Sequence, residues 1–190
     1  MTTLVGSVAA WTVLLVLLIA VAGHLASPTT LSRAVAAHGV LPRPMTVAAA
    51  VTLAEVSLVA AGAVAVSSHS AGWLRFPAFA GSAALFAAYA GYTQHVRAIR
   101  PGAPCGCSRG ELPVTGWVVA RAYLLAGLAL LAAVLSGSVL TVDRPGDPLV
   151  VVLLAATAFG ALLWHLPAAM HLPTRTPHHA DTRQLREGAA

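Results

Sequence analysis

Five long apolar runs constrain the fold of this chain more than any other feature. They cover residues 4–25, 45–66, 73–92, 114–135 and 149–170. In hydrocarbon, each backbone polar group must be satisfied within its own segment, so an apolar run of about 20 residues is expected to form a helix about 30 Å long. The runs therefore predict an all-α, polytopic membrane bundle with about five transmembrane helices.

Composition excludes an ordinary water-soluble domain. Of the 190 residues, 58% are hydrophobic and 9% are charged, and the mean hydropathy is +0.80. Abundant Gly and Ala allow close helix packing within a bilayer. We divide the chain into a four-helix core over residues 1–136, a further helix over 137–170 and a disordered tail over 171–190. The first run is interpreted as a helix and not as a signal peptide, because Met-Thr-Thr supplies no basic segment before it.

Arginine placement predicts the orientation, because basic residues concentrate on the cytoplasmic side of membrane proteins. All 11 basic residues are Arg. Eight of them lie in regions that five helices would put on one side: Arg33, Arg43, Arg97, Arg100, Arg109, Arg175, Arg183 and Arg186. The other side holds Arg75 and Arg144. This predicts a multi-pass protein of the cell membrane with its N-terminus outside and its C-terminus in the cytoplasm, where the basic tail could meet lipid headgroups. The sequence pI of 10.2 does not indicate nucleic-acid binding, because basic and aromatic residues are not interleaved.

Two charged residues fall inside apolar runs. At 1.5 Å per residue, Glu55 would lie about 14 Å and Arg121 about 10 Å from the same membrane face. Intramembrane charges are costly and usually face the interior of a bundle, so an ion pair between them is one expectation. The pair could fix the helix register, or Glu55 could relay protons near a redox site.

The only two cysteines, Cys105 and Cys107, lie one residue apart between the third and fourth runs. Because Gly106 tolerates unusual backbone angles, the pair could close a small, strained disulfide that is easily reduced. Nearby cations favour the reactive thiolate, and three arginines are close in sequence: Arg97, Arg100 and Arg109. The spacing fits a redox dithiol, but also a metal site or two thiols with neither role.

The metal alternative involves three histidines at predicted helix ends, His24, His95 and His165. Two thiolates with two imidazoles suit zinc, and two facing imidazoles can hold haem. However, the histidines show no local spacing typical of metal ligands, so we predict no metal site.

Several local features together resemble one family. They are Gly23-His24-Leu25, a proline-bearing loop that ends in Val40-Leu41-Pro42, Glu55 in mid-helix, Cys105-Gly106-Cys107, and Arg121 at the start of a Leu-rich helix. On these features, the chain resembles the MauE family of methylamine-utilisation membrane proteins, which have a DoxX-like four-helix character. The resemblance covers about residues 5–135. His24 stands where Lys is more usual, and the run at 149–170 lies beyond the family core.

The resemblance implies a membrane partner in thiol–disulfide chemistry. Such a protein would act with a thioredoxin-like protein in the maturation of disulfide-bearing enzymes such as methylamine dehydrogenase. Cys105 and Cys107 would exchange electrons with the partner. The residues that would support this exchange are Glu55, Arg121 and the loop arginines Arg97, Arg100 and Arg109. No cofactor is identified, although a quinone could be the second carrier. The rival class is a non-enzymatic membrane scaffold, and a transporter is disfavoured because few polar residues lie within the runs.

Overall fold

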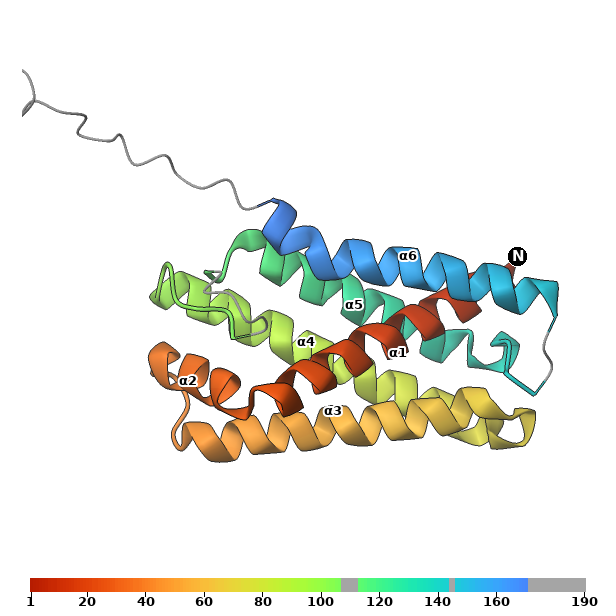
Figure 1. Ribbon diagram of the computed structural model, residues 1–190, viewed down its shortest axis with the longest axis horizontal. Helices are drawn as coiled ribbons and strands as arrows, with labels where there is room; N and C mark the ends of the chain where they lie inside the picture. The colour runs from red at the N-terminus through yellow and green to blue at the C-terminus, as the bar shows by residue number, and fades with distance from the viewer. Residues whose placement is uncertain (107–112, 144–145, 171–190) are drawn as a thin grey trace, which may run out of the picture.

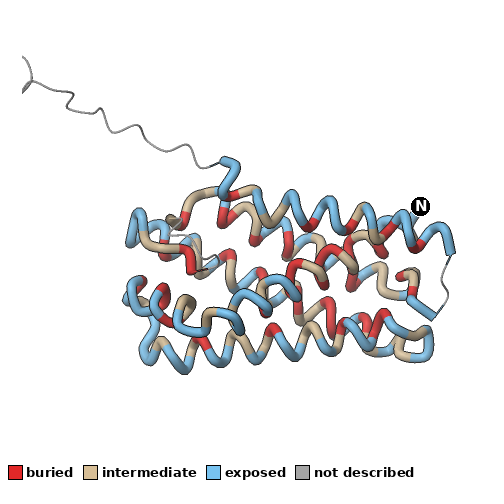
Figure 2. Tube along the Cα trace, viewed as in Figure 1, coloured by how far each residue is buried: buried red, intermediate tan, exposed pale blue. Residues whose placement is uncertain are grey.

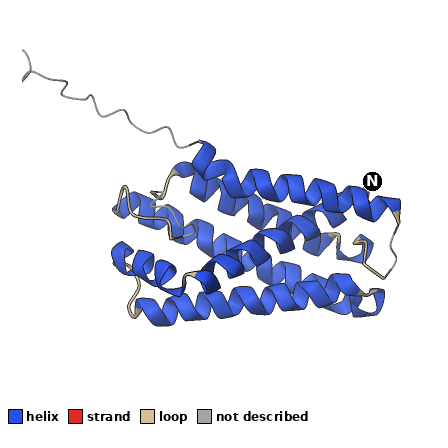
Figure 3. Cartoon of the chain, in the orientation of Figure 1, coloured by secondary structure: helices blue, strands red, loops and turns tan. Residues whose placement is uncertain are grey.

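The computed structural model describes residues 1–106, 113–143 and 146–170. Within these ranges, all the named secondary-structure elements are helices, as Figure 3 shows. The order is α1 (Thr2–Ala26), α2 (Pro28–His38), α3 (Pro44–Ser67), the 3₁₀ helix η1 (His69–Leu74), α4 (Arg75–Ile99), α5 (Gly116–Val134), the 3₁₀ helix η2 (Ser136–Ser138) and α6 (Asp147–Ala169). The predicted all-α bundle is confirmed. The predicted disordered tail lies outside the described residues.

Helix α1 occupies the centre of the bundle. It packs against α3, α5 and α6, while α4 packs between α3 and α5 (Figure 1). The N-terminus lies at one end of the bundle, and α2 and the C-terminal end of α6 lie at the other. The apolar core forms where α1 meets its neighbours, and buried residues are concentrated in the interior of the bundle (Figure 2). Its fully buried side chains include Val13, Leu17 and Phe79.

Each predicted apolar run corresponds to one long helix, but the runs differ in how well they suit a membrane. Four described helices, α1, α3, α5 and α6, are long and apolar enough to cross a bilayer. Helix α4 is not among them, although it has 25 residues and runs alongside the others. Its last third is polar, with Tyr89, Tyr92, Thr93, Gln94 and His95. The chain is therefore a multi-pass membrane protein with four apolar spanning helices and a fifth, more polar long helix.

Small residues bring the helices together, as their abundance predicts. A Cβ atom at Gly81 of α4 would lie 2.8 Å from Leu58 Cδ2 of α3, and one at Gly62 of α3 would collide with the Leu14 side chain of α1. In lipid, such close approach supplies dispersion contacts that hydrocarbon chains cannot match. Glycine thus allows close packing where α3 meets α1 and where it meets α4.

The segment after α1, interpreted from the sequence as a loop, is mostly a helix, and this corrects that interpretation. Pro28 opens α2 at a position where a missing N–H costs nothing. Ala34, Val35 and His38 are buried on one face, so tertiary packing stabilises an 11-residue helix of low overall apolar content. Gly39 then ends α2 with φ +65°, in the left-handed region that glycine adopts without strain.

Arg75 is built into the end of the bundle that holds the N-terminus of the chain. Its side chain is only 2% exposed. The guanidinium donates to the carbonyl of Ala65 at 3.0 Å, to that of Ser68 at 3.3 Å and to that of Ser136 at 3.4 Å. Carbonyl groups at a helix C-terminus have no hydrogen-bonding partner within the helix. Arg75 supplies donors to such carbonyl groups at the end of α3 and also connects this end to η2. Its role is structural.

Candidate functional site

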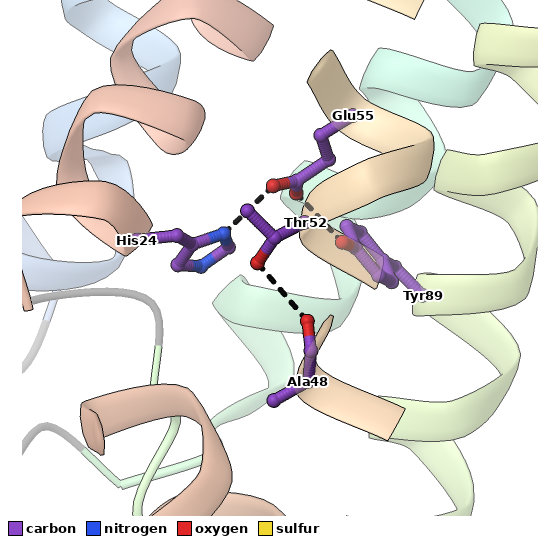
Figure 4. Close-up of polar contacts among 5 residues, drawn as sticks. All are labelled: His24, Ala48, Thr52, Glu55 and Tyr89. Carbon is purple, nitrogen blue, oxygen red and sulfur yellow. Dashed lines mark hydrogen bonds and ion pairs between the residues drawn. The ribbon is translucent and has the colours of Figure 1, made fainter. Parts of the chain in front are cut away.

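A buried carboxylate lies where α1, α3 and α4 meet. Glu55 of α3 is 1% exposed. Tyr89 of α4 donates a hydrogen bond to its Oε1 at 2.6 Å, and Nδ1 of His24 in α1 lies 2.7 Å from its Oε2 (Figure 4). Thr52 points to the same region, but its hydroxyl donates to the Ala48 carbonyl of its own helix. We refer to His24, Glu55 and Tyr89 as the Glu55 cluster.

The Glu55 cluster corrects the expected ion pair with Arg121. The carboxylate of Glu55 is paired with the imidazole of His24. Arg121 is half-buried on α5, where its Cζ lies 5.8 Å from the centre of the Trp164 ring of α6, in cation–π geometry. Similar depth along two helices does not make two residues neighbours, because each helix can turn its charge toward a different side of the bundle.

Cys105 lies in a closed loop at the end of the bundle that holds α2. The loop is narrow at its base, where Val114 N–H donates to the Ala103 carbonyl at 2.8 Å. Cys105 is 9% exposed and belongs to a small apolar cluster with Val96 and Val118. This cluster packs the loop against the facing ends of α4 and α5. Cys107 and Arg109, both predicted site residues, lie outside the described residues.

Gly106 holds the loop against α2. Its φ is +70°, a conformation that side chains rarely adopt, and a Cβ atom there would lie 2.5 Å from the Ala34 Cβ. The expectation that this glycine takes unusual backbone angles is therefore confirmed. Glycine is required both for the turn and for the close approach to α2.

His38 joins the loop to the rest of the bundle, a role that no pattern in the sequence indicates. It is the last residue of α2 and is 3% exposed. Its Nε2 lies 2.8 Å from the Pro104 carbonyl oxygen, directly before Cys105, and its Nδ1 lies 2.8 Å from the Tyr92 hydroxyl of α4. The Pro104 carbonyl is thus tied to two helices through one imidazole.

Arg97 and Arg100 lie at the same end of the bundle and are exposed. The guanidinium of Arg100 lies beside Gly39, where a Cβ atom would be 3.3 Å from Nη2, and that of Arg97 lies beside Gly116 at the start of α5. A cation beside Gly39 is favourable, because a helix C-terminus carries partial negative charge. Their predicted effect on a thiolate stays a prediction.

The histidines of the metal alternative are not gathered around Cys105. The imidazole of His24 contacts the carboxylate of Glu55, while His95 and His165 are exposed on α4 and α6. No group of three or more His, Cys, Asp or Glu suited to a metal occurs in the part of the chain that the structure describes.

Two tyrosines that the sequence interpretation passed over connect the polar features. Tyr89 reaches Glu55, and Tyr92, one helical turn later, reaches His38. Residues three apart share one helix face, so this spacing was a usable signal. It was passed over because tyrosine is common near the ends of membrane helices without any special role. Helix α4 therefore carries both Tyr89, which donates to the buried carboxylate of α3, and Tyr92, which reaches the imidazole that binds the Cys loop.

Comparison with known proteins gives one result. The family model described as "Methylamine utilisation protein MauE" matches residues 2–135, which includes α1 to α5. No curated protein and no solved structure matches the chain. The match contains Glu55, the Cys loop and His38, whereas α6 lies outside it.

Proposed function

This chain belongs to the MauE family, and we propose that it is a membrane thiol–disulfide relay that serves methylamine utilisation with a thioredoxin-like partner. The observation that carries this proposal is the fixed position of Cys105 in a glycine-dependent loop at the end of the bundle. A loop of this kind presents chemistry at the membrane boundary, where a protein partner could meet it. Cys107, one residue beyond Gly106, supplies the second thiol.

The proposed step is a balanced exchange of two electrons. The thiolate of one cysteine attacks the disulfide of the partner, which forms a mixed disulfide and releases one partner thiolate. The second cysteine then attacks the mixed disulfide, so that Cys105 and Cys107 are oxidised to a disulfide. The partner leaves as a dithiol that carries the two protons lost from the cysteines. The reverse sequence would deliver a disulfide to the partner. A quinone as the second carrier stays a prediction from sequence.

Charge near the loop supports the proposal. Arg97 and Arg100 extend from the last turn of α4 and its C-terminal cap, and positive charge favours thiolate over thiol. We assign the Glu55 cluster a structural part in this function. It ties together the three helices α1, α3 and α4, and so fixes the helix that supports the loop.

Thiol trapping in membranes tests the relay. Of the full-length variants Cys105→Ser and Cys107→Ser, the one that keeps the attacking thiol should accumulate a mixed disulfide with a thioredoxin-like protein, because the thiol needed to resolve it is missing, and the other should trap no partner. The unaltered chain should show both an oxidised and a reduced form whose ratio follows the redox state of the cells.

The matched control carries a cysteine at the opposite end of the bundle. In a chain with both native cysteines changed to Ser, Ser70→Cys places an exposed thiol on η1. This thiol should be alkylated but should trap no partner. If the double Cys→Ser variant supports growth on methylamine as well as the unaltered chain does, the relay is wrong and the non-enzymatic scaffold becomes the better account.

A further inference from the structure

The imidazole of His38 has a defined hydrogen-bonding arrangement. A carbonyl oxygen only accepts hydrogen bonds, so Nε2, 2.8 Å from the Pro104 oxygen, must carry a hydrogen. In the neutral ring, Nδ1 is then an acceptor, and the Tyr92 hydroxyl at 2.8 Å donates to it. The direction of donation therefore runs from Tyr92 through His38 to the backbone directly before Cys105.

The loop is held on both sides of Cys105. On one side, His38 binds the Pro104 carbonyl, and on the other, Gly106 lies directly against Ala34 of the same helix α2. Between these two attachments, the Cys105 side chain is buried among apolar residues. A disulfide of another protein must approach a thiolate sulfur directly, and a cysteine residue that is 9% exposed offers little room for that approach.

From this geometry, we propose that His38 is a positioning residue for Cys105. Through the Pro104 carbonyl it holds the segment Pro104-Cys105-Gly106 against α2, which keeps the Cys105 side chain buried, and a partner gains access when this hydrogen bond is released. This inference rests on the proposed function, and it adds a control point to it. Tyr92 orients the imidazole, and α2 is the support against which the loop closes.

The test measures the rate at which a maleimide labels Cys105 in the full-length protein in membranes. A Cys107→Ser background makes Cys105 the reporter. His38→Leu removes both hydrogen bonds and should raise the labelling rate about tenfold, the change expected when one or two ordinary hydrogen bonds no longer hold the loop closed. Tyr92→Phe leaves the Pro104 bond in place but unsupported, and should raise the rate about threefold.

Substitution of His38 by amide-bearing residues distinguishes a hydrogen-bonding role of this side chain from a role in packing alone. In His38→Gln, the side-chain amide can place an N–H near the Nε2 position and donate to Pro104, so labelling should return close to the original rate. His38→Asn has a similar amide on a shorter side chain that does not reach Pro104, and should label as fast as His38→Leu. Equal rates for Gln and Leu at this position would overturn the proposal.

A second reporter guards against general unfolding. Ala133→Cys, in a chain without the native cysteines, places a thiol in the apolar core of the bundle. Its labelling should not change with His38→Leu, and a parallel increase would show general loosening and refute a local role. If His38→Leu does not accumulate, the comparison of His38→Asn with His38→Gln decides, and equal rates for these two refute the proposal.

The labelling experiment needs no partner, so its outcome is independent of the relay itself. If His38→Leu accelerates labelling but no partner is trapped, the proposed thiol–disulfide exchange is refuted and the positioning role of His38 is supported. If a partner is trapped but His38→Leu does not change the labelling rate, the relay is supported and the positioning role of His38 is refuted.

Discussion

Removal of His24 should destabilise the bundle far more than removal of Arg121. Glu55 is buried at 1% exposure and has two hydrogen-bonding partners. Breaking a buried pair costs roughly 3–5 kcal/mol in soluble proteins, whereas measured couplings between membrane helices average about 0.6 and reach about 1.7 kcal/mol. Because the pair joins two membrane helices, we expect a value between these figures, about 2 kcal/mol, for His24→Leu.

Arg121 provides the contrast, because its contact is weaker and partly exposed. A cation–π contact at an exposed site contributes roughly 0.5–1 kcal/mol, so Arg121→Gln should cost less than about 1 kcal/mol. Tyr89→Phe removes one hydrogen bond to a charged group and should cost about 1.5 kcal/mol. Had Glu55 been paired with Arg121, the order of the His24 and Arg121 variants would be reversed.

A double-mutant cycle measures the pairing itself. His24→Leu combined with Glu55→Leu should cost about 1 kcal/mol less than the sum of the two single variants, because the double variant leaves no stranded charge. Unfolding can be followed in mixed detergent micelles by the fluorescence of the 4 tryptophans. Additivity within about 0.3 kcal/mol, or an Arg121→Gln effect as large as that of His24→Leu, would refute the assignment of the Glu55 cluster.

Two further predictions concern the loop and the orientation. Gly106→Ala should release the loop and accelerate labelling of Cys105, since its Cβ would lie 2.5 Å from Ala34; Gly102→Ala, with φ +83° but open space around it, should have a smaller effect. Labelling rates for the two variants in one background check this, and equal rates would contradict it. For orientation, the arginine pattern predicts that a reporter fused after Ala190 is active only in the cytoplasm, and activity only outside the membrane would reverse the assignment.

Much of the fold was predictable because lipid imposes a simple rule on sequence. The apolar runs identify each long helix to within a few residues, because an unsatisfied backbone is too costly in hydrocarbon. Helix α2 could not be predicted in this way, because its stability comes from one buried face and not from its own composition. The polar end of α4 was equally visible in the sequence, but its length alone suggested an ordinary span.

For the candidate site, the sequence by itself determined which side chains are unusual: a carboxylate in mid-membrane, and two cysteines around a glycine. It also gave the depth of Glu55 along its helix. Only the tertiary structure decided the partners, turning Glu55 toward His24 and Tyr89 and placing His38 beneath the Cys loop. The physical reason is that residue spacing fixes position along a helix axis, whereas the neighbours of a side chain depend on how each helix rotates and packs against the others.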